Sequence, residues 1–232
     1  MISFKQLFAA CGVVFLLTAC ASQGDPRDPL EPMNRAIHDF NETVDKVAMK
    51  PLAEGYQAVL PGFAQTGVRN FFSNLDDVVV VANDLLQFKL EQASRDVMRL
   101  ALNSTWGLGG VLDIASEAGL KKHNEDFGQT LGHWGVGTGP YLVLPFFGPS
   151  NFRDTVGLFA DSSYLDAVYG LQDDEARNGS VLLRAVSRRA DLLAAKSALD
   201  TAALDGYEYT RDFHLERRRA LVYDGKPPKI LE

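Results

Sequence analysis

Apolar residues recur at intervals of three and four along most of this chain, and this spacing constrains the fold more than any other feature of the sequence. Between Leu30 and Val47 the gaps alternate between three and four, which places the apolar residues on one stripe of a helix. Asp28 is its expected N-cap, Pro29 fits its first turn and Pro51 is expected to end it. The pattern predicts an all-α protein built from amphipathic helices.

The same spacing predicts further helices along the chain. A short helix carries Leu52 and Tyr56 on one side and stops at Pro61-Gly62. The valine run 78–81 would suit a strand, but the three-four spacing continues on both sides of it and favours a helix. Helices are expected at about Gly67–Phe88, 91–105, Leu108–Leu120, Arg153–Tyr169, from a Ser180 cap to about Leu199, and Asp205–Tyr223.

Glycine becomes dense between Trp106 and Pro149, and glycine breaks long helices while permitting close backbone approach. Within this stretch, the apolar segment 141–147 is bracketed by Gly139-Pro140 and Gly148-Pro149. One interpretation is a buried extended segment. The other is a hairpin or loop that meets a membrane or a partner protein.

The N-terminus has the pattern of an export signal. Lys5 precedes an apolar run, 7–17, which is shorter than the about 20 residues that a spanning helix needs. The segment ends at Cys20, and the pattern Leu-Thr-Ala-Cys resembles the bacterial lipoprotein signal, in which the cysteine becomes the acylated N-terminus. We therefore expect residues 1–19 to be removed and Cys20 to carry the lipid. The alternative is an ordinary secreted protein with a cysteine near its cleavage site by chance.

The residues around Cys20 also bear on the membrane to which the protein is sorted, and removal of the signal sets the net charge of the remaining chain. Ala21 and Ser22, rather than an acidic residue, come after the cysteine and favour the outer membrane. Lys5 is the only charged residue in 1–19, so the remaining chain carries 22 basic and 30 acidic side chains, a net charge of −8. An acidic balance argues against nucleic acid as a partner.

Residues for covalent chemistry are scarce. Cys11 lies in the signal and Cys20 is used by acylation, so no thiol remains. The histidines are not paired at metal-ligand spacing, and the motifs of serine hydrolases and of P-loop nucleotide-binding proteins are absent from the sequence. We predict no catalytic residue, metal or cofactor. The basic run Arg217-Arg218-Arg219 is expected to be a solvated face, or alternatively a contact for lipid phosphates.

Several irregular motifs, in order along residues 26–225, resemble the MlaA (VacJ) lipoproteins. The N-terminal signature is Asp28–Arg35 followed by Phe40-Asn41, and the next block is Arg69–Leu75 followed by Asn83–Gln87. The most specific part is Phe127–Val136, followed by Gly139–Pro145 and Gly148–Ser150. Arg153-Asp154, Asp161, Tyr207, Arg211 and Arg217 complete the match. The motif residues of interest are Asn34, Arg35, Asn41, Asn70, Asn74, Asn83, Arg153 and Asp154.

The resemblance implies a ring-like all-α fold that lies in the inner leaflet of the outer membrane. It implies a polar-lined path by which mislocalised phospholipids leave the outer leaflet, with trimeric porins of the OmpC or OmpF type and the periplasmic carrier MlaC as partners. In such a ring, the glycine-rich loop is expected to line or gate the opening, with Gly128, Gly132, Gly135, Gly137, Gly139 and Pro140 as candidates. The expected organisation is a signal at 1–19, an acylated tether at 20–28, one domain at 29–225 and a tail at 226–232.

Three functions remain as hypotheses. The first is a non-enzymatic component of phospholipid transport that maintains lipid asymmetry. The second is an envelope scaffold that binds porins without carrying lipid. The third, an envelope hydrolase, is disfavoured by the missing nucleophile motif and thiol.

Overall fold

A computed structural model describes residues 25–228, with the side chain of residue 202 left out. The prediction for Cys20 lies outside the described residues. Most of the described chain is helical, and it contains one two-stranded antiparallel hairpin. In order, the elements are α2 Glu31–Val44, the π-helical turn η2 Asp45–Met49, α3 Lys50–Val59, α4 Gly62–Leu86, α5 Leu90–Thr105, α6 Ile114–Glu117, α7 Phe127–His133, β1 Tyr141–Leu144, β2 Gly148–Asn151, α8 Phe152–Tyr164, α9 Asp174–Asp191, α10 Leu193–Ala202 and α11 Gly206–Val222.

The first predicted helix is longer than its sequence signals suggested. Pro51 does not end it, because the π turn interrupts the regular hydrogen-bond ladder and places the proline in the first turn of α3, where its missing N–H needs no partner. Asp28 is not the N-cap either. Helix α2 begins after Leu30, and Asp28 instead accepts a hydrogen bond of 2.8 Å from the side chain of Asn34.

Two other boundaries also differ from the prediction. The expected helix 108–120 shrinks to the four residues of α6, because Leu108, Gly109 and Gly110 all adopt left-handed backbone angles. Ser180 lies inside α9, which starts earlier because Asp173 caps it by accepting 2.7 Å from the N–H of Ala176.

The valine run 78–81 lies in a helix, and the apolar segment 141–147 lies in a hairpin. The valines lie within the 25-residue helix α4, as predicted. The segment 141–147 forms the hairpin, in which Tyr141 pairs with Asn151 and Leu144 with Gly148. Tyr141 and Val143 are buried, as the first interpretation predicted, whereas Phe146 and Phe147 at the tip are exposed. The segment is part of a hairpin, and its contact with a membrane or a partner stays a prediction.

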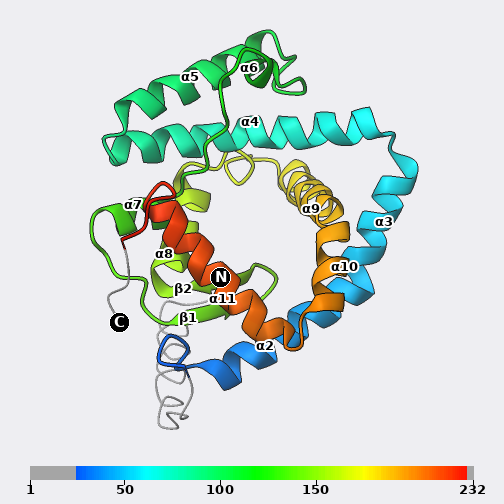
Figure 1. Cartoon of the computed structure of the whole chain (residues 1–232). Helices are drawn as coiled ribbons and strands as arrows, with labels where there is room; N and C mark the ends of the chain where they lie inside the picture. The colour runs from blue at the N-terminus through cyan, green and yellow to red at the C-terminus, as the bar shows by residue number, and fades with distance from the viewer. Residues whose placement is uncertain (1–24, 229–232) are drawn as a thin grey trace.

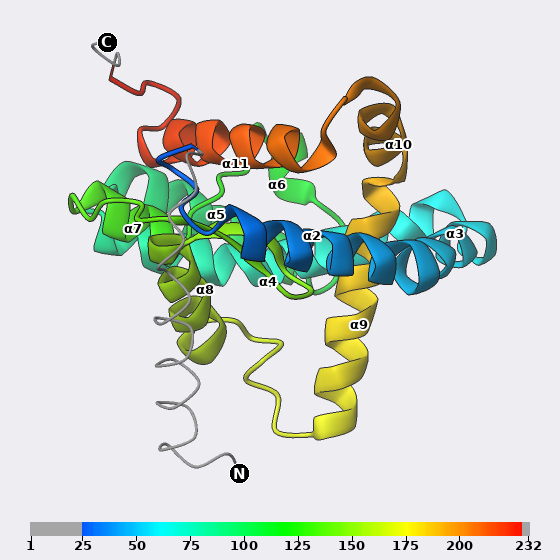
Figure 2. The same cartoon turned by 90° about the horizontal axis from the view of Figure 1, so that it is seen from below.

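Packing contacts between the elements form a closed circuit (Figure 1). Helix α2 contacts β1, β2 contacts α8, α8 contacts α7, α7 contacts α4, α4 contacts α9, and α9 contacts α3, which continues from α2. Helices α5 and α6 lie outside this circuit against α4. In Figure 2, α10 and α11 lie on one face of the circuit, while the end of α8 and the start of α9 project from the other.

The described helices were also compared with the length and hydropathy that a transmembrane helix requires. Within residues 25–228, none combines the length and the apolar character needed to cross a membrane.

Candidate functional site

Helix α5 buries polar side chains against the protein and exposes several large apolar ones, next to the exposed charges of Glu91 and Arg95. The side chains that it buries against α4 and α6 include Asp96, Arg99 and Asn103, whereas the exposed ones include Leu90, Val97 and Met98. An amphipathic helix in water normally buries its apolar stripe. Exposed apolar side chains over a polar interface are typical of a surface that contacts a membrane or another protein.

Ion pairs and hydrogen bonds fill the interface that α5 makes with α4. The Arg99 guanidinium is 2% exposed and bonds the Asp113 carboxylate at 3.2 Å and the carbonyl of Leu120. Lys122 bonds Asp77 of α4, whose pKa is raised by burial against the opposing charges of Lys122 and Arg99. The opposite charges of Arg99, Lys122 and Asp77 compensate one another, although Nε of Arg99 and one oxygen of Asp77 are buried without a hydrogen-bond partner and lie 3.9 Å apart.

A second polar cluster lies near the start of α5. Asp84 of α4 and Asp96 of α5 are both fully buried, and Asp84 accepts 2.9 Å from Gln92 while Asp96 bonds His123 at 2.8 Å. Burial, followed by the hydrogen bond and the negative charge of Asp96, raises the pKa of Asp84 to about 8. A raised pKa means that this buried pair of carboxyl groups holds a proton more tightly than a free carboxyl does. Sequence reasoning missed both clusters, although the spacing of Asp96, Arg99 and Asn103 is itself three-four.

Exposed apolar side chains are not confined to α5. Large ones occur on the hairpin tip, on α8 and at the start of α4. The set that is more than two-thirds exposed includes Phe63, Phe88, Trp106, Leu108, Phe146 and Tyr164. Such an apolar exterior is typical of a surface that meets a membrane or another protein.

Two asparagines of α2 hold the hairpin through its backbone. Asn34 donates 3.0 Å to the carbonyl of Tyr141 and accepts 2.9 Å from the N–H of Val143. About two helical turns further along α2, Asn41 donates 2.9 Å to the carbonyl of Leu144 and accepts 2.8 Å from the N–H of Phe146. The two side chains pair with backbone groups of β1 and its turn, as a neighbouring strand would, and they fix the hairpin against α2.

The remaining motif asparagines also join elements of the fold. Asn70 bonds the carbonyl of Val111 at 3.2 Å, and Asn74 bonds Ser104 at 3.0 Å. Asn83 links α4 to α8 and α7, because it donates 3.1 Å to Asp161 and accepts 2.8 Å from Thr130. The structure gives these residues packing roles, and it does not bring them together into one site.

The motif residue Arg35 joins α2 to the start of α11. It pairs with Glu31 at 2.8 Å, Asp205 at 2.9 Å and Glu208 at 3.3 Å. The guanidinium also lies 4.4 Å from the ring centroid of Tyr207. Arg35 therefore holds the start of α11 against α2.

Arg218 joins α7, α8 and α11. Its guanidinium bonds Asp126 at 2.6 Å and Asp154 at 2.7 Å, and Arg153 bonds the second oxygen of Asp154 at 2.8 Å. Burial would raise the pKa of Asp126, but the hydrogen bonds and charge of Arg218 lower it below its usual value. The basic run 217–219 is therefore not one solvated face, because its middle member is locked in the interior.

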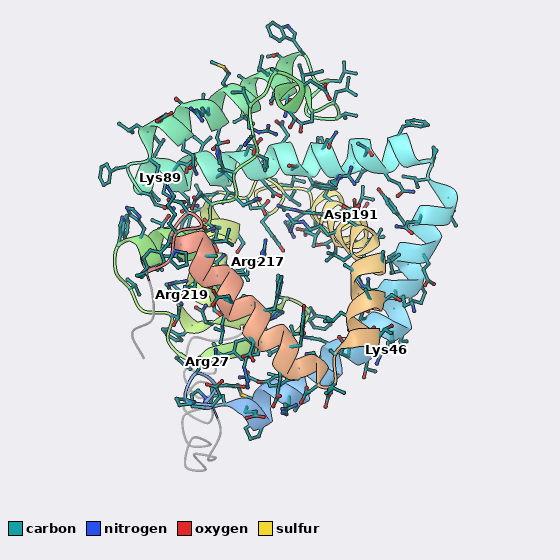
Figure 3. All side chains as sticks on the ribbon, viewed as in Figure 1. Arg27, Lys46, Lys89, Asp191, Arg217 and Arg219 are labelled. Carbon is teal, nitrogen blue, oxygen red and sulfur yellow. The ribbon has the colours of Figure 1, made fainter. Side chains whose placement is uncertain are left out.

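Arg217 differs from its two neighbours. It is exposed, and among the described residues it has no ion-pair or hydrogen-bond partner, whereas Arg219 bonds the carbonyl of Pro228. In Figure 3, Arg217 lies on the side of α11 that faces the space enclosed by the circuit, and Arg219 lies on the opposite side. Arg217 is thus an uncommitted positive charge beside that space.

The candidate glycines fall into two groups. Gly128 and Gly132 pack closely, since a Cβ atom on Gly128 would lie 2.6 Å from Asp154 and one on Gly132 would lie 2.7 Å from Arg153. Gly135, Gly137 and Gly139 lie in an exposed loop after α7, and Gly135 and Gly139 have positive φ angles of 89° and 67°. Pro140 ends this loop, and its carbonyl accepts 3.1 Å from the N–H of Phe152. Their role at an opening stays a prediction.

Metal-ligating groups were sought among the described residues. Residues 25–228 contain no group of three or more histidine, cysteine, aspartate or glutamate side chains that could hold a metal ion.

Comparisons with known proteins place these features in a family. The sequence pattern described as MlaA lipoprotein matches residues 26–221. An uncharacterized protein of Rickettsia bellii is 31% identical over 195 residues, covering 84% of this chain and 76% of that protein. The Escherichia coli K12 protein named intermembrane phospholipid transport system lipoprotein MlaA is 34% identical over 219 residues, covering 91% of this chain and 86% of that protein.

A solved structure is also similar to this chain. It is described as the structural basis for maintenance of bacterial outer membrane lipid asymmetry, and it matches with a TM-score of 0.74 at 33% sequence identity. The match covers 84% of this chain and 98% of the other.

Proposed function

The chain belongs to the MlaA lipoprotein family, and from this premise we propose that it is the outer-membrane lipoprotein component of an intermembrane phospholipid transport system. It removes mislocalised phospholipids from the outer leaflet and passes them to a periplasmic carrier. The process moves lipid without making or breaking covalent bonds, so this chain is not an enzyme. The result is the maintenance of lipid asymmetry.

The inverted polarity of α5 is the structural observation that carries this proposal. A helix that buries Asp96 and Arg99 and exposes Val97 and Met98 is stable when its outer face lies among acyl chains. The exposed aromatic side chains of the hairpin tip and of α8 extend the apolar exterior. These features support a ring of helices lying within the inner leaflet of the outer membrane.

The position of Asp25 supports an orientation in which the α11 face of this ring points toward the periplasm. Asp25 pairs with Arg211 of α11 at 3.5 Å, so the N-terminal segment reaches the circuit on its α11 face. Five residue steps separate Asp25 from Cys20, and they span at most about 18 Å. An acylated Cys20 therefore holds the α11 face near the periplasmic surface of the leaflet, and the end of α8 projects toward the outer leaflet.

The lipid path requires polar side chains, because a phospholipid headgroup cannot be desolvated without cost. Arg217 is our candidate for a phosphate contact on this path, since it is exposed, lacks a partner among the described residues and faces the enclosed space. The loop 134–140 is our candidate for the gate, with Gly135, Gly137 and Gly139 as the positions that give it freedom. Trimeric porins and an MlaC-type carrier are the partners that family membership implies.

Deletion of the gene tests the proposal. We expect phospholipid to surface in the outer leaflet, with sensitivity to detergent and chelator, and the native chain to restore the barrier. The protein purified from membranes should carry phospholipid. Porin binding without any bound or transferred phospholipid would contradict the proposal and support the scaffold hypothesis instead.

Alanine at Gly135, Gly137 and Gly139 tests the gate. This triple variant should impair lipid clearance at normal abundance, because two of the three positions need a left-handed backbone. Gly55→Ala is the control, since it makes the same change at an exposed position of α3 where a Cβ would meet nothing within 4 Å and φ is not in the left-handed region. Full activity of the triple variant would reject the gate.

A further inference from the structure

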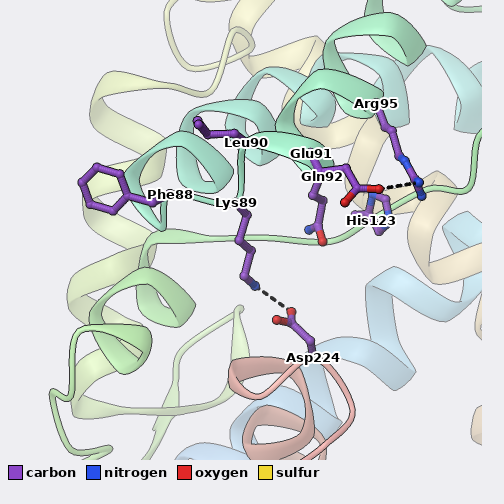
Figure 4. A pocket seen from close by; sticks show the side chains of 8 residues that line it. All are labelled: Phe88, Lys89, Leu90, Glu91, Gln92, Arg95, His123 and Asp224. Carbon is purple, nitrogen blue, oxygen red and sulfur yellow. Dashed lines mark hydrogen bonds and ion pairs between the residues drawn. The ribbon is translucent and has the colours of Figure 1, made fainter.

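A groove opens where the chain turns from α4 into α5 (Figure 4). Its volume is about 570 Å³, and the residues that line it are Phe88, Lys89, Leu90, Glu91, Gln92, Arg95, His123 and Asp224. The turn is made by Phe88, whose φ of 59° is left-handed. Phe88 and Leu90 are exposed and give the groove an apolar rim.

The polar part of the groove carries both signs of charge. Lys89 pairs with Asp224 at 2.6 Å and with Glu125 at 3.0 Å, and Arg95 pairs with Glu91 at 2.7 Å. The balance favours a ligand that itself carries a positive and a negative group. A simple anion would meet Glu91 and Asp224 as repulsive neighbours.

Hydrogen-bonding capacity remains for such a ligand. Only one nitrogen of the Arg95 guanidinium is engaged, and its side chain is 57% exposed. His123 uses Nδ1 to bond Asp96, which leaves Nε2 for another partner. No side chain caps the start of α5, and the unpaired N–H groups of a first helical turn add to the attraction for a phosphate.

We propose that this groove binds the headgroup of a zwitterionic phospholipid from the surrounding leaflet. The phosphate contacts Arg95 and His123, the ammonium contacts Asp224 or Glu91, and the acyl chains lie along Leu90, Val97 and Met98. The groove lies outside the circuit of helices, so this lipid is distinct from the one in transit. The inference rests on the proposed function only for the placement of the protein in a leaflet.

Calorimetric titration of the purified full-length lipoprotein in micelles with dihexanoyl phosphatidylethanolamine tests the proposal. Arg95→Glu should weaken binding about tenfold or more, because one charge-assisted contact is replaced by repulsion. Lys46→Glu is the matched control, since it makes the same change of charge at an exposed residue on the far side of the circuit and should bind like the native chain.

A second variant separates the headgroup from the acyl chains. Leu90→Ser should weaken binding of the dihexanoyl lipid and leave binding of glycerophosphoethanolamine unchanged. Equal binding of inorganic phosphate or of dihexanoyl phosphatidylglycerol would overturn the zwitterionic assignment. Native affinity in Arg95→Glu would overturn the site itself. If Arg95→Glu binds the lipid with native affinity while the native chain restores lipid asymmetry to gene-deleted cells, the groove is rejected and the proposed function stands.

Discussion

The interface between α4 and α5 and the interface between α3 and α9 are built in opposite ways. Between α3 and α9, the buried side chains are Ala53, Tyr56, Val186 and Ala190, with Met49, Leu60 and Leu193 packed around them. Between α4 and α5, the buried side chains are mainly carboxylates, an arginine and amides. The α3–α9 contact is a small hydrophobic core of the usual kind, whereas the α4–α5 contact is held by ion pairs and hydrogen bonds.

The difference shows where each region finds its apolar surroundings. A polar interface is favourable when the outer face of α5 is already removed from water, because burying that apolar face would then gain little. Association of helices in lipid depends on packing and polar contacts rather than on the hydrophobic effect. The α3–α9 contact therefore resembles a soluble protein, and the α4–α5 contact resembles a membrane protein.

The largest effect is expected for Arg99→Ala. The variant removes the buried guanidinium that neutralises Asp77 and Asp113 and leaves Asp77 with Lys122 as its one cationic partner, and removing one member of a buried ion pair costs roughly 3–5 kcal/mol. Denaturation in micelles measures the free energy of unfolding. Arg95→Ala, on the same helix but exposed, is the control and should change it by less than about 1 kcal/mol. Equal effects of the two variants would mean that the α4–α5 interface does not depend on its charges.

Val186→Ala tests the hydrophobic interface between α3 and α9. Val186 is buried in the α3–α9 core, and truncation of a buried aliphatic side chain should lower the free energy of unfolding by about 1–3 kcal/mol. The same denaturation measurement applies. A loss near zero would show that this core is loosely packed and would remove the contrast between the two regions.

The buried carboxyl pair predicts a pH dependence for the α4–α5 region. The pKa of Asp84 is about 8 in the folded protein. Burial raises it most, the hydrogen bond and charge of Asp96 and the charge of Glu125 raise it further, and the charge of Lys89 lowers it. The unfolded carboxyl has a pKa of about 3.9, so the folded state binds more protons and its stability falls as pH rises toward 8, by at most about 1.4 kcal/mol per pH unit.

Asp84→Asn should flatten this dependence when the unfolding free energy is measured between about pH 6.5 and 8.5. His214 contributes with the opposite sign, but at lower pH, because burial and the Arg218 charge lower its pKa to about 4. His123, bonded to Asp96, remains in place in the variant. An unchanged slope would show that Asp84 does not carry the proton.

The smallest effect on stability is expected on the outer face of α5. Val97→Ser combined with Met98→Ser removes apolar side chains that are about half exposed, so the free energy of unfolding should change by no more than about 1 kcal/mol. Binding to phospholipid vesicles should nevertheless weaken. A large loss of stability with unchanged vesicle binding would place this face in the protein interior.

Much of the helical content follows from the sequence. The three-four spacing located α4, α5, α8 and α11, and the glycines before α6 explain why the helix predicted there is short. The hairpin remained one of two alternatives, because a seven-residue apolar segment with a proline carries no pairing information. Asp28 and Ser180 were misassigned as caps, because a capping residue type occurs at many positions and only local geometry selects among them.

The polarity of α5 was not predictable in the same way. Asp96, Arg99 and Asn103 follow the same three-four spacing as the apolar stripe, so the sequence contains two complete faces. Which face turns inward depends on the surrounding medium and on the partners that the fold supplies, such as Asp77 and Asp113. The motif asparagines likewise gave no sign that Asn34 and Asn41 would hold a hairpin more than 100 residues away.

A label on the outer face of α5 tests directly the central claim that this face lies among the acyl chains of the membrane. Cys11 and Cys20 are the only cysteines of the sequence and both lie before residue 25, so Val97→Cys gives one labelling position in the described chain. A fluorophore there, on the protein reconstituted in vesicles without any porin, should be quenched by a quencher attached to the lipid chains and protected from one in water. Quenching by the aqueous reagent alone would contradict the account.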